Sequence, residues 1–188
     1  MATQSCVKLN KKSDDEWYTP RDVWQPLAEN FIPKDKVLWE PFLGDGKSTE
    51  HLRSFGFEVI STDEDFFECN YGDIVVTNPP FSKTEKVLKR LVELQKPFIL
   101  ILPDHKLGAK YMNKVFLGDP FGLDLLIPGD RIEYIRKQDE TDKEGTRLRV
   151  PFNSIFDCWK IPTVPKGMTF LPQRKPKKKT RQDKERKK

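Results

Sequence analysis

Asp73-Ile-Val-Val-Thr-Asn-Pro-Pro-Phe81 is the stretch from which the fold can be worked out. It begins with an apolar run, Ile74 to Val76, followed by Thr77. Such a run is too short and too apolar for a surface helix and is typical of a buried strand in a parallel sheet. Two prolines then end the strand, because neither donates a backbone hydrogen bond and each fixes φ. The stretch therefore predicts an Asn side chain, a proline carbonyl and an aromatic ring at the carboxyl end of a strand, where open α/β sheets bind ligands.

The tetrapeptide Asn78-Pro79-Pro80-Phe81 carries groups that suit one particular reaction. An exocyclic amine on an aromatic base is a poor nucleophile because its lone pair is delocalised into the ring. Two acceptors aimed at its hydrogens favour the pyramidal, nucleophilic form, and the Asn78 side-chain oxygen and the Pro79 carbonyl would supply them. Phe81 would stack on the base, an interaction worth about 1–3 kcal/mol. The same residues also fit a plain Asn-Pro-Pro turn, so the motif needs a second signal.

That second signal lies upstream, in a predicted strand, Gly-rich turn and helix. The strand covers Val37 to Trp39, Glu40 sits at its end, Gly44 and Gly46 allow a tight turn, and Lys47 to Phe55 predicts a helix. This unit is typical of a Rossmann-like sheet. It is no phosphate loop, since the GxxxxGK(S/T) and GxGxxG spacings are absent. Glu40 would repel a pyrophosphate and suits a cationic or amino-bearing ligand, such as the methionine end of S-adenosylmethionine.

A second strand, Phe57 to Thr62, is followed by Asp63 in the position where nucleotide-binding sheets place a carboxylate on ribose hydroxyls. The residues that come next are candidates for contacts with adenosine, with a plain acidic loop as the alternative: Glu64, Asp65 and Phe66. Only 15 residues separate Asp63 from Asn78. We therefore expect the crossover between these two strands to be reduced to a loop or short turn.

The remaining elements predict an α/β, Rossmann-like sheet that is mostly parallel, with an antiparallel C-terminal hairpin and helices on both faces. The expected helices are Arg21 to Phe31, with Thr19 as its cap and Pro20 at its first position, Lys83 to Gln95, capped by Ser82, and a short one within 108–121. The expected later strands are Pro97 to Leu102, Arg131 to Ile135 and, as the final strand and antiparallel partner of 131–135, Pro151 to Ile161. The charged stretch between Lys137 and Arg149 predicts a mobile loop.

The charge is divided unevenly along the chain. Residues 172–188 hold ten basic and two acidic residues, whereas residues 1–171 hold 24 basic and 27 acidic ones. We expect a flexible N-terminus over 1–14, one domain over 15–171 and a disordered basic tail over 172–188. The tail predicts sequence-independent contacts with nucleic acid, with a localisation or solubility segment as the alternative. Its candidate contact residues are Lys175, Lys177, Lys178, Lys179 and Arg181.

Cysteine and histidine usage excludes a zinc site of the usual kind. Three widely spaced cysteines form no CxxC pair, and there are only two histidines, so we expect no metal. Reduced thiols and the lack of a signal-peptide core favour an intracellular protein, cytoplasmic or nuclear. No apolar run approaches the ~20 residues of a membrane span, so no membrane partner is expected.

Taken in order, the motifs resemble those of the DNA N6-adenine methyltransferases of phages and bacteria, which use S-adenosylmethionine. The segment Asp15-Glu-Trp-Tyr-Thr-Pro20 is similar to their N-terminal cofactor-contacting motif. Glu40-Pro-Phe-Leu-Gly-Asp-Gly46 resembles their methionine-binding loop, and Asn78-Pro-Pro-Phe81 matches their catalytic tetrapeptide. The resemblance covers roughly residues 15–161. It implies cofactor contacts by Tyr18, Thr19, Pro20, Pro41 and Phe42, besides those named above.

The resemblance implies direct methyl transfer to the exocyclic amine of an adenine that is flipped out or already single-stranded. The tetrapeptide is shared by RNA adenine and protein glutamine methyltransferases, so an enzyme acting on an mRNA cap or structured RNA stays open. A catalytically silent, nucleic-acid-binding subunit is a third hypothesis. No large target-recognition domain is evident. Target recognition would then fall to loops near 105–121 and 137–150, to the tail, or to a protein partner.

Overall fold

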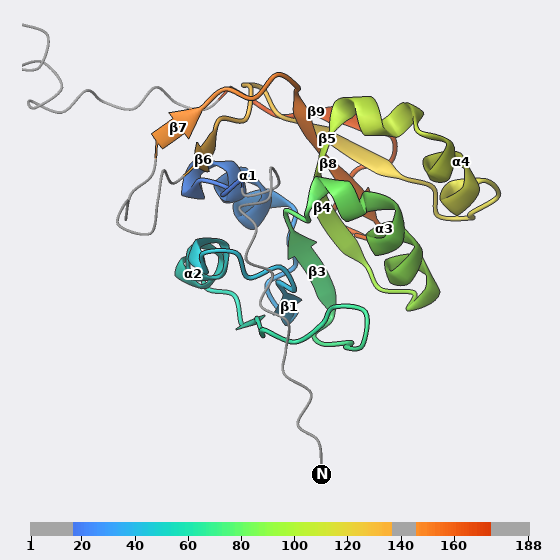
Figure 1. Cartoon of the computed structure of the whole chain (residues 1–188), viewed down its shortest axis with the longest axis horizontal. Helices are drawn as coiled ribbons and strands as arrows, with labels where there is room; N and C mark the ends of the chain where they lie inside the picture. The colour runs from blue at the N-terminus through green and yellow to red at the C-terminus, as the bar shows by residue number, and fades with distance from the viewer. Residues whose placement is uncertain (1–16, 137–145, 174–188) are drawn as a thin grey trace, which may run out of the picture.

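A seven-stranded sheet forms the centre of the computed structural model, which describes residues 17–136 and 146–173 (Figure 1). The strand order is β2-β1-β3-β4-β8-β5-β9. The strands are β1 Leu38–Trp39, β2 Val59–Ile60, β3 Ile74–Thr77, β4 Phe98–Pro103, β5 Asp124–Ile127, β8 Ser154–Trp159 and β9 Met168–Phe170. Strands β1 to β4 run parallel, and β8 is antiparallel to its neighbours β4 and β5. The expected mostly parallel α/β sheet is confirmed.

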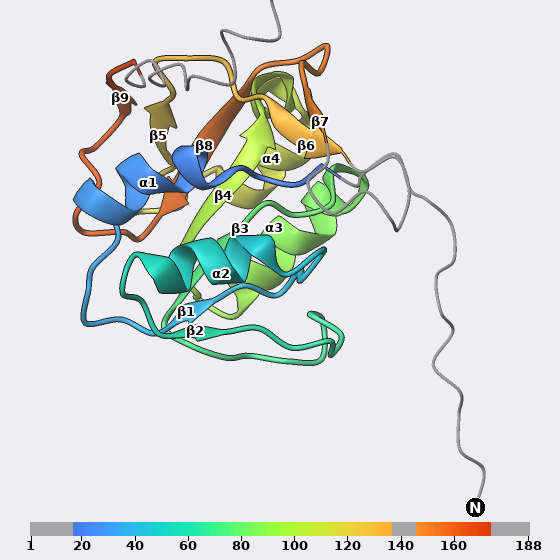
Figure 2. The ribbon, with the colours of Figure 1, turned by 90° about the vertical axis from the view of Figure 1, so that its left-hand side faces the viewer.

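Helices cover both faces of the sheet (Figure 2). Helices α1 (Arg21–Asn30) and α2 (Lys47–Ser54) lie on one face, and α3 (Thr84–Glu93) and α4 (Lys110–Phe116) lie on the other. Short 3-10 turns, η1 (Phe81–Lys83) and η2 (Asp104–Gly108), follow β3 and β4. Because both faces are covered, the central strands β3, β4 and β8 are buried along their whole length. This accounts for their near-continuous apolar sequences.

The chain reverses its direction of winding at β1. From β1 it moves outward to β2, and then it returns to β3 on the other side of β1. Such a reversal opens a crevice at the carboxyl ends of the two central strands. The crossover between β2 and β3 contains neither helix nor strand, as its length predicts. Its aromatic residues pack instead against the end of β1, with Phe66 5.3 Å from Trp39 between ring centres.

A two-stranded ribbon stands apart from the main sheet and reaches the N-terminal segment. Strands β6 (Tyr134–Arg136) and β7 (Thr146–Leu148) pair with each other in antiparallel fashion. The backbones of Tyr18 and Ile135 exchange two hydrogen bonds, of 2.9 and 2.8 Å, so residues 17–19 form a strap along the edge of this ribbon. A bidentate pair between Asp22 and Arg147 also joins α1 to the ribbon.

The pairing of 151–161 with 131–135 is wrong. Residues 154–159 enter the main sheet between β4 and β5, because their side chains are apolar enough to be buried on both faces. The partner of β6 comes instead from the charged stretch: Thr146 to Leu148 form a strand rather than part of a loop. The rest of that loop, 137–145, lies outside the described residues. The final described strand is β9, not 151–161.

Two predicted helix caps are also wrong. Thr19 is buried and makes no capping bond, and Pro20 occupies the cap position of α1 without a side-chain bond. Ser82 lies inside the η1 turn, and α3 begins two residues later. In the described ranges, no helix combines the length and apolar character that crossing a membrane would require.

Candidate functional site

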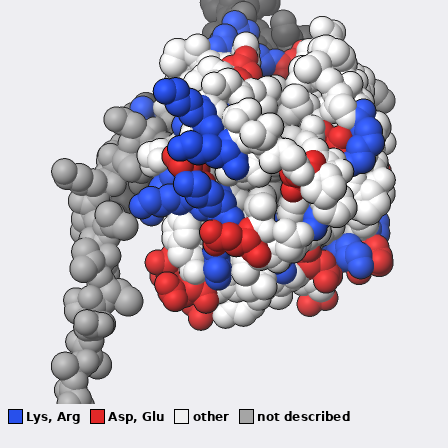
Figure 3. Space-filling view, turned by 90° about the vertical axis from the view of Figure 1, so that its right-hand side faces the viewer, with Lys and Arg blue, Asp and Glu red and all other residues white. Residues whose placement is uncertain are grey.

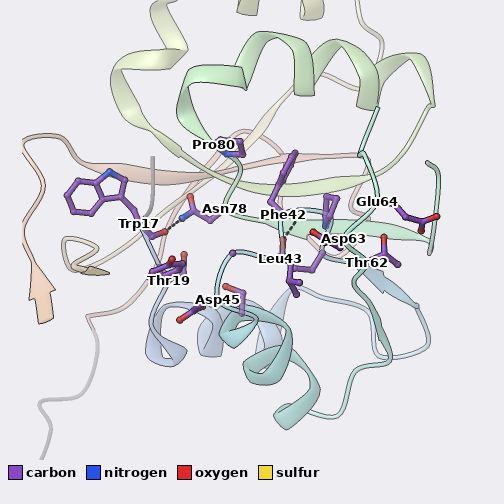
Figure 4. A pocket seen from close by; sticks show the side chains of 15 residues that line it. Trp17, Thr19, Phe42, Leu43, Asp45, Thr62, Asp63, Glu64, Asn78 and Pro80 are labelled. Atoms are coloured by element: carbon purple, nitrogen blue, oxygen red, sulfur yellow. Dashed lines mark hydrogen bonds between the residues drawn. The ribbon is translucent and has the colours of Figure 1, made fainter. Parts of the chain in front are cut away.

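A cavity of about 390 Å³ opens at the crevice between the carboxyl ends of β1 and β3 (Figure 4). Four segments line it: the strap 17–19, the loop and helix start after β1, the end of β2, and the loop after β3. The lining residues are Trp17, Tyr18, Thr19, Glu40, Pro41, Phe42, Leu43, Gly44, Asp45, Ser48, Thr62, Asp63, Glu64, Asn78 and Pro80. The volume lies within the range of small-molecule sites, about 300–1,000 Å³.

The side-chain amide of Asn78 is held in one orientation. Its Nδ2 donates a hydrogen bond of 2.8 Å to the main-chain carbonyl of Trp17. Its Oδ1 is buried and has no hydrogen-bond partner within the described part of the chain. Leaving a buried acceptor unpaired costs about 1–3 kcal/mol, so such atoms call for an explanation. Because the residue lines the cavity, Oδ1 is placed to accept a hydrogen from a ligand.

Glu40 is a buried carboxyl at the end of β1. Burial raises its pKa to about 8, and hydrogen bonds from Thr77 and from the backbone of Phe42 act in the opposite direction. The bond from the Phe42 nitrogen to Oε1 is 3.1 Å long, and the Thr77 hydroxyl donates to the same oxygen. A cationic ligand would stabilise the ionised form of this buried carboxyl, because an adjacent positive charge opposes the effect of burial on its pKa.

The loop between β1 and α2 approaches the strap closely. Gly44 has φ +53°, and a Cβ at this position would lie 3.3 Å from the Tyr18 ring. A side chain would therefore be strained and crowded there. Gly46, with φ +78°, precedes α2 and does not line the cavity. Its contribution is to turn the chain into the helix.

Asp63 and Glu64, after β2, are both exposed and line the far end of the cavity from the strap (Figure 4). The Tyr71 hydroxyl donates to Glu64 Oε2 at 2.9 Å. The structure does not bring Asp65 and Phe66 to the cavity lining. Asp65 Oδ1 accepts from the Phe67 nitrogen at 3.0 Å and stabilises a turn, while Phe66 is buried in the aromatic cluster beside β1.

The Phe81 ring points into the core rather than into the cavity. It is 9% exposed, and it meets Phe152 and Tyr134 edge-on, at 5.5 and 6.3 Å between ring centres. Its carbonyl accepts bonds of 2.8 Å from Lys106 Nζ and Thr84 Oγ1, which fix the turn. Neither Phe81 nor Pro79 is among the lining residues, whereas Asn78 and Pro80 are.

The cavity lining includes several of the expected site residues and five further ones. The expected residues that the structure brings together are Tyr18, Thr19, Glu40, Pro41, Phe42, Gly44, Asp63, Glu64, Asn78 and Pro80. Pro20 does not line the cavity, and the candidate tail residues 175–181 lie outside the described residues. The lining residues that were missed are Trp17, Leu43, Asp45, Ser48 and Thr62. Trp17 could have been found, since a large aromatic beside Tyr18 in a polar segment is itself a signal.

No family model matches the chain. Over 92 residues it is 30% identical to the type II methyltransferase M.EcoRI of Escherichia coli, covering 45% of this chain and 28% of that relative. The chain thus spans under a third of the length of the curated relative it matches. A structure from Pyrococcus horikoshii, proposed to be an RNA methyltransferase, is 15% identical with a TM-score of 0.49, covering 75% of this chain and 81% of that one.

A structure from Listeria monocytogenes, proposed to be a class I S-adenosylmethionine-dependent methyltransferase, has a TM-score of 0.50 to this chain. It is 14% identical, and the match covers 87% of this chain and 68% of that one. Together with the strand order, this likeness shows that the chain has an α/β, Rossmann-like fold.

Proposed function

We propose that this protein is an S-adenosylmethionine-dependent methyltransferase that acts on nucleic acid, with the N6 amine of adenine in DNA as its acceptor. The observation that carries the proposal is the side chain of Asn78. Its nitrogen is bonded to the Trp17 carbonyl, and its buried oxygen is a spare acceptor at the cavity. The partial identity with M.EcoRI supports the same reading.

The residues present fit S-adenosylmethionine. The buried Glu40 carboxyl suits its cationic methionine end, the loop 41–44 would lie along it, and Asp63 would accept hydrogen bonds from ribose hydroxyls. Both carboxylates line one cavity of suitable volume, Glu40 directly after β1 and Asp63 after β2. When bound, this cofactor supplies a methyl group made electrophilic by a positively charged sulfur.

The role of the protein in the reaction is to position the acceptor. Asn78 Oδ1 would accept a hydrogen of the amine, which favours its pyramidal, nucleophilic form. The bond from Asn78 to Trp17 keeps the amide from rotating, so the acceptor does not have to be ordered during the reaction. The target base would have to be flipped out of its stack or already be single-stranded, because a cavity at the sheet edge cannot be reached from within a duplex.

A row of exposed lysines on the folded domain suits a polyanionic substrate. Lys83 ends the η1 turn, Lys86 and Lys89 follow it on α3, and Lys110 and Lys114 lie on α4, which packs beside α3. These five residues form the lysine face. Lys114 is close enough to act on Glu85, whose pKa is lowered mainly by its bond to Lys89. Figure 3 shows basic side chains gathered on this side of the molecule.

The basic tail is proposed to add to this attraction, through Lys175, Lys177, Lys178, Lys179 and Arg181. Removing residues 174–188 should then weaken binding to nucleic acid and flatten its salt dependence. An RNA adenine methyltransferase is the second candidate. The specific observation in its favour is that only the β6–β7 ribbon is added to the sheet among the described residues, so no large DNA-reading domain is seen there.

The decisive experiment is transfer of a labelled methyl group to DNA, RNA and protein, followed by nucleoside analysis. For Asn78→Ala we expect the rate to fall by at least about 100-fold, the usual effect of losing one positioned polar group at a reacting centre. Binding of S-adenosylmethionine, measured by calorimetry, should change only a few-fold. Asn30→Ala, at an exposed position at the end of α1, serves as the matched control. Undiminished transfer by Asn78→Ala would overturn the proposal, as would a wild-type protein that binds no methyl donor.

A further inference from the structure

Lys106 connects the loop after β4 to the turn after β3. It lies in η2, and its Nζ donates a hydrogen bond of 2.8 Å to the main-chain carbonyl of Phe81. Pro80, the residue before Phe81, lines the cavity. The η2 turn is itself fixed, because Asp104 and Asn153 share a backbone bond of 3.0 Å and a side-chain bond of 3.3 Å. The ammonium group of Lys106 is therefore held beside a turn that borders the candidate site.

The Phe81 carbonyl has a second donor, so it does not depend on Lys106 for a partner. The Thr84 hydroxyl donates to the same oxygen at 2.8 Å, and Thr84 is buried. A neutral donor is thus already present, and what the lysine adds is a positive charge. Taking a charge partly out of water costs free energy unless it is paired. The lysine therefore calls for a role that a hydroxyl group cannot fill.

The charge of Lys106 has no partner of opposite sign within residues 17–136 and 146–173. The residue is half-buried, yet no carboxylate of these ranges forms an ion pair with it. One of its three N–H groups is bonded to the Phe81 carbonyl, and the other two have no protein acceptor in these ranges. A compact ammonium group with free donors is a common ligand of phosphate groups.

A second cavity marks a path that a polyanionic strand could follow from this point. Its volume is about 720 Å³, it begins at Leu107, the residue after Lys106, and Lys110 and Lys114 line it farther along the chain. Positively charged side chains thus extend from the η1 turn to α4. A basic groove of this kind suits the phosphates of a nucleic-acid strand.

We propose that Lys106 binds a backbone phosphate next to the target nucleotide and, through the Phe81 carbonyl, positions the η1 turn against the strand. This inference rests on the proposed function and specifies how its substrate is anchored. A base that reaches Asn78 brings its neighbouring phosphates to the rim of the cavity. A cation bonded to the adjoining turn then holds the strand and the turn in one arrangement. Phosphate contacts fix position and carry no sequence information, so the contact would serve any target sequence.

A change in the substrate matched to a change in the protein tests the phosphate contact. The substrate is a single-stranded oligonucleotide with one adenine, and each of the two phosphates that flank this adenine is replaced in turn by an uncharged methylphosphonate. For the wild type, we expect one replacement to weaken binding by about 10- to 100-fold, the usual effect of losing a hydrogen bond to a charged group. In Lys106→Met, which removes the charge and keeps an unbranched apolar stem, the same replacement should have no effect. Fluorescence anisotropy measures both affinities.

Further variants separate this contact from a general structural effect. Lys106→Met should lower kcat at saturating oligonucleotide by up to about 100-fold, because a displaced turn misplaces the reacting groups. It should also reduce the slope of log affinity against log salt by about 0.7, with S-adenosylmethionine binding unchanged. Lys106→Arg keeps the charge and should recover the slope and part of the rate.

The control is Lys96→Met. Lys96 is likewise half-buried and donates to main-chain carbonyls, those of Tyr71 and Gly72, but it precedes β4 and so lies at the opposite end of that strand from Lys106. Its substitution should leave both the salt slope and KM for the oligonucleotide unchanged.

The outcomes distinguish this inference from the function on which it rests. If the wild type transfers methyl groups but neither methylphosphonate weakens its binding, or if the cost is the same in Lys106→Met, then Lys106 does not bind the phosphate although the proposed function stands. The first of these results needs no variant, so it holds even if Lys106→Met does not fold. Wild-type kcat in Lys106→Met would show that Lys106 does not position the turn. If the wild type transfers no methyl group to nucleic acid, the proposed function itself fails.

Discussion

The Thr77 hydroxyl donates a hydrogen bond to the Glu40 carboxylate, across the two strands between which the sheet reverses its winding. Thr77 is the last residue of β3 and directly precedes Asn78, while Glu40 directly follows β1. Both side chains are buried. One bond therefore connects the carboxyl proposed to face the cofactor with the residue proposed to hold the acceptor amine.

Thr77→Val keeps the shape of the side chain and removes this donor. Because the Thr77 bond lowers the pKa of Glu40, its loss should raise that pKa further and leave less of the carboxylate at neutral pH. We expect S-adenosylmethionine to bind about 5-fold more weakly at pH 7.5, the equivalent of roughly 1 kcal/mol for one hydrogen bond. Calorimetry measures the change. If Thr77→Val binds S-adenosylmethionine as tightly as the wild type at every pH, the hydrogen bond from Thr77 to Glu40 does not influence cofactor binding.

Glu40 should couple cofactor binding to proton release. Burial holds its pKa at about 8, so the unliganded protein carries a largely neutral carboxyl at pH 7. A bound cation favours the ionised form, so binding expels the proton, and affinity should rise with pH, by up to tenfold per unit, and level off above about pH 8. Calorimetry in buffers of different ionisation enthalpy counts the protons. Glu40→Gln should bind S-adenosylmethionine weakly, with an affinity that does not change with pH. If the affinity of this variant still rises with pH, the released proton comes from another group.

Asp157 should make the protein less stable as the pH rises. It lies in β8, both of its carboxylate oxygens are buried without a partner in the described residues, and burial raises its pKa to about 8. An unfolded Asp titrates near 3.9, so the folded state holds an extra proton between about pH 4 and pH 8. Stability is therefore greatest below this window and falls across it by about 1.4 kcal/mol per pH unit.

Asp157→Asn cannot lose that proton. Its melting temperature should exceed that of the wild type at pH 8, and the difference should narrow as the pH approaches 5. Thermal unfolding across this range checks the prediction, with Glu40→Gln run in parallel because Glu40 titrates in the same direction. If the melting temperatures of the wild type and of Asp157→Asn differ by the same amount from pH 5 to pH 8, Asp157 is not protonated in the folded protein.

The lysine face should account for part of the salt dependence of nucleic-acid binding. Each phosphate contact contributes about 0.9 to the slope of log affinity against log salt on duplex DNA. Lys83→Gln combined with Lys86→Gln should therefore lower the slope by up to about 2, without changing cofactor affinity. The control pair is Lys36→Gln with Lys166→Gln, two exposed lysines that lie on neither α3 nor α4. If the two double variants show the same slope of log affinity against log salt, the lysine face does not contact the nucleic acid.

The parts of the site that sequence could predict depend on short-range signals. Glu40, Asp63 and Asn78 each follow a strand directly, and parallel strands bring their carboxyl ends to one edge. The short spacing between Asp63 and Asn78 likewise predicted a crossover without a helix. These inferences needed no knowledge of distant contacts, and all three residues line one cavity.

The parts that failed depend on partners far away in the chain. Whether Phe81 faces the cavity is decided by Tyr134 and Phe152, which lie more than 50 residues later. Residues 131–135 were expected to pair with 151–161, yet β6 pairs with Thr146–Leu148, which come from a charged stretch. In a ribbon that is largely exposed, pairing leaves little hydrophobic signal in the sequence.

The bridge between Tyr18 and Ile135 sets an order of assembly. A growing chain on the ribosome would display Glu40 and Asn78 long before Ile135 is synthesised, and until then the backbone of Tyr18 lacks its two hydrogen bonds to Ile135. The pocket would thus be completed by a strand that emerges more than 50 residues after Asn78. A nascent chain halted before residue 134 would carry the reacting groups in sequence but lack the strand that secures them.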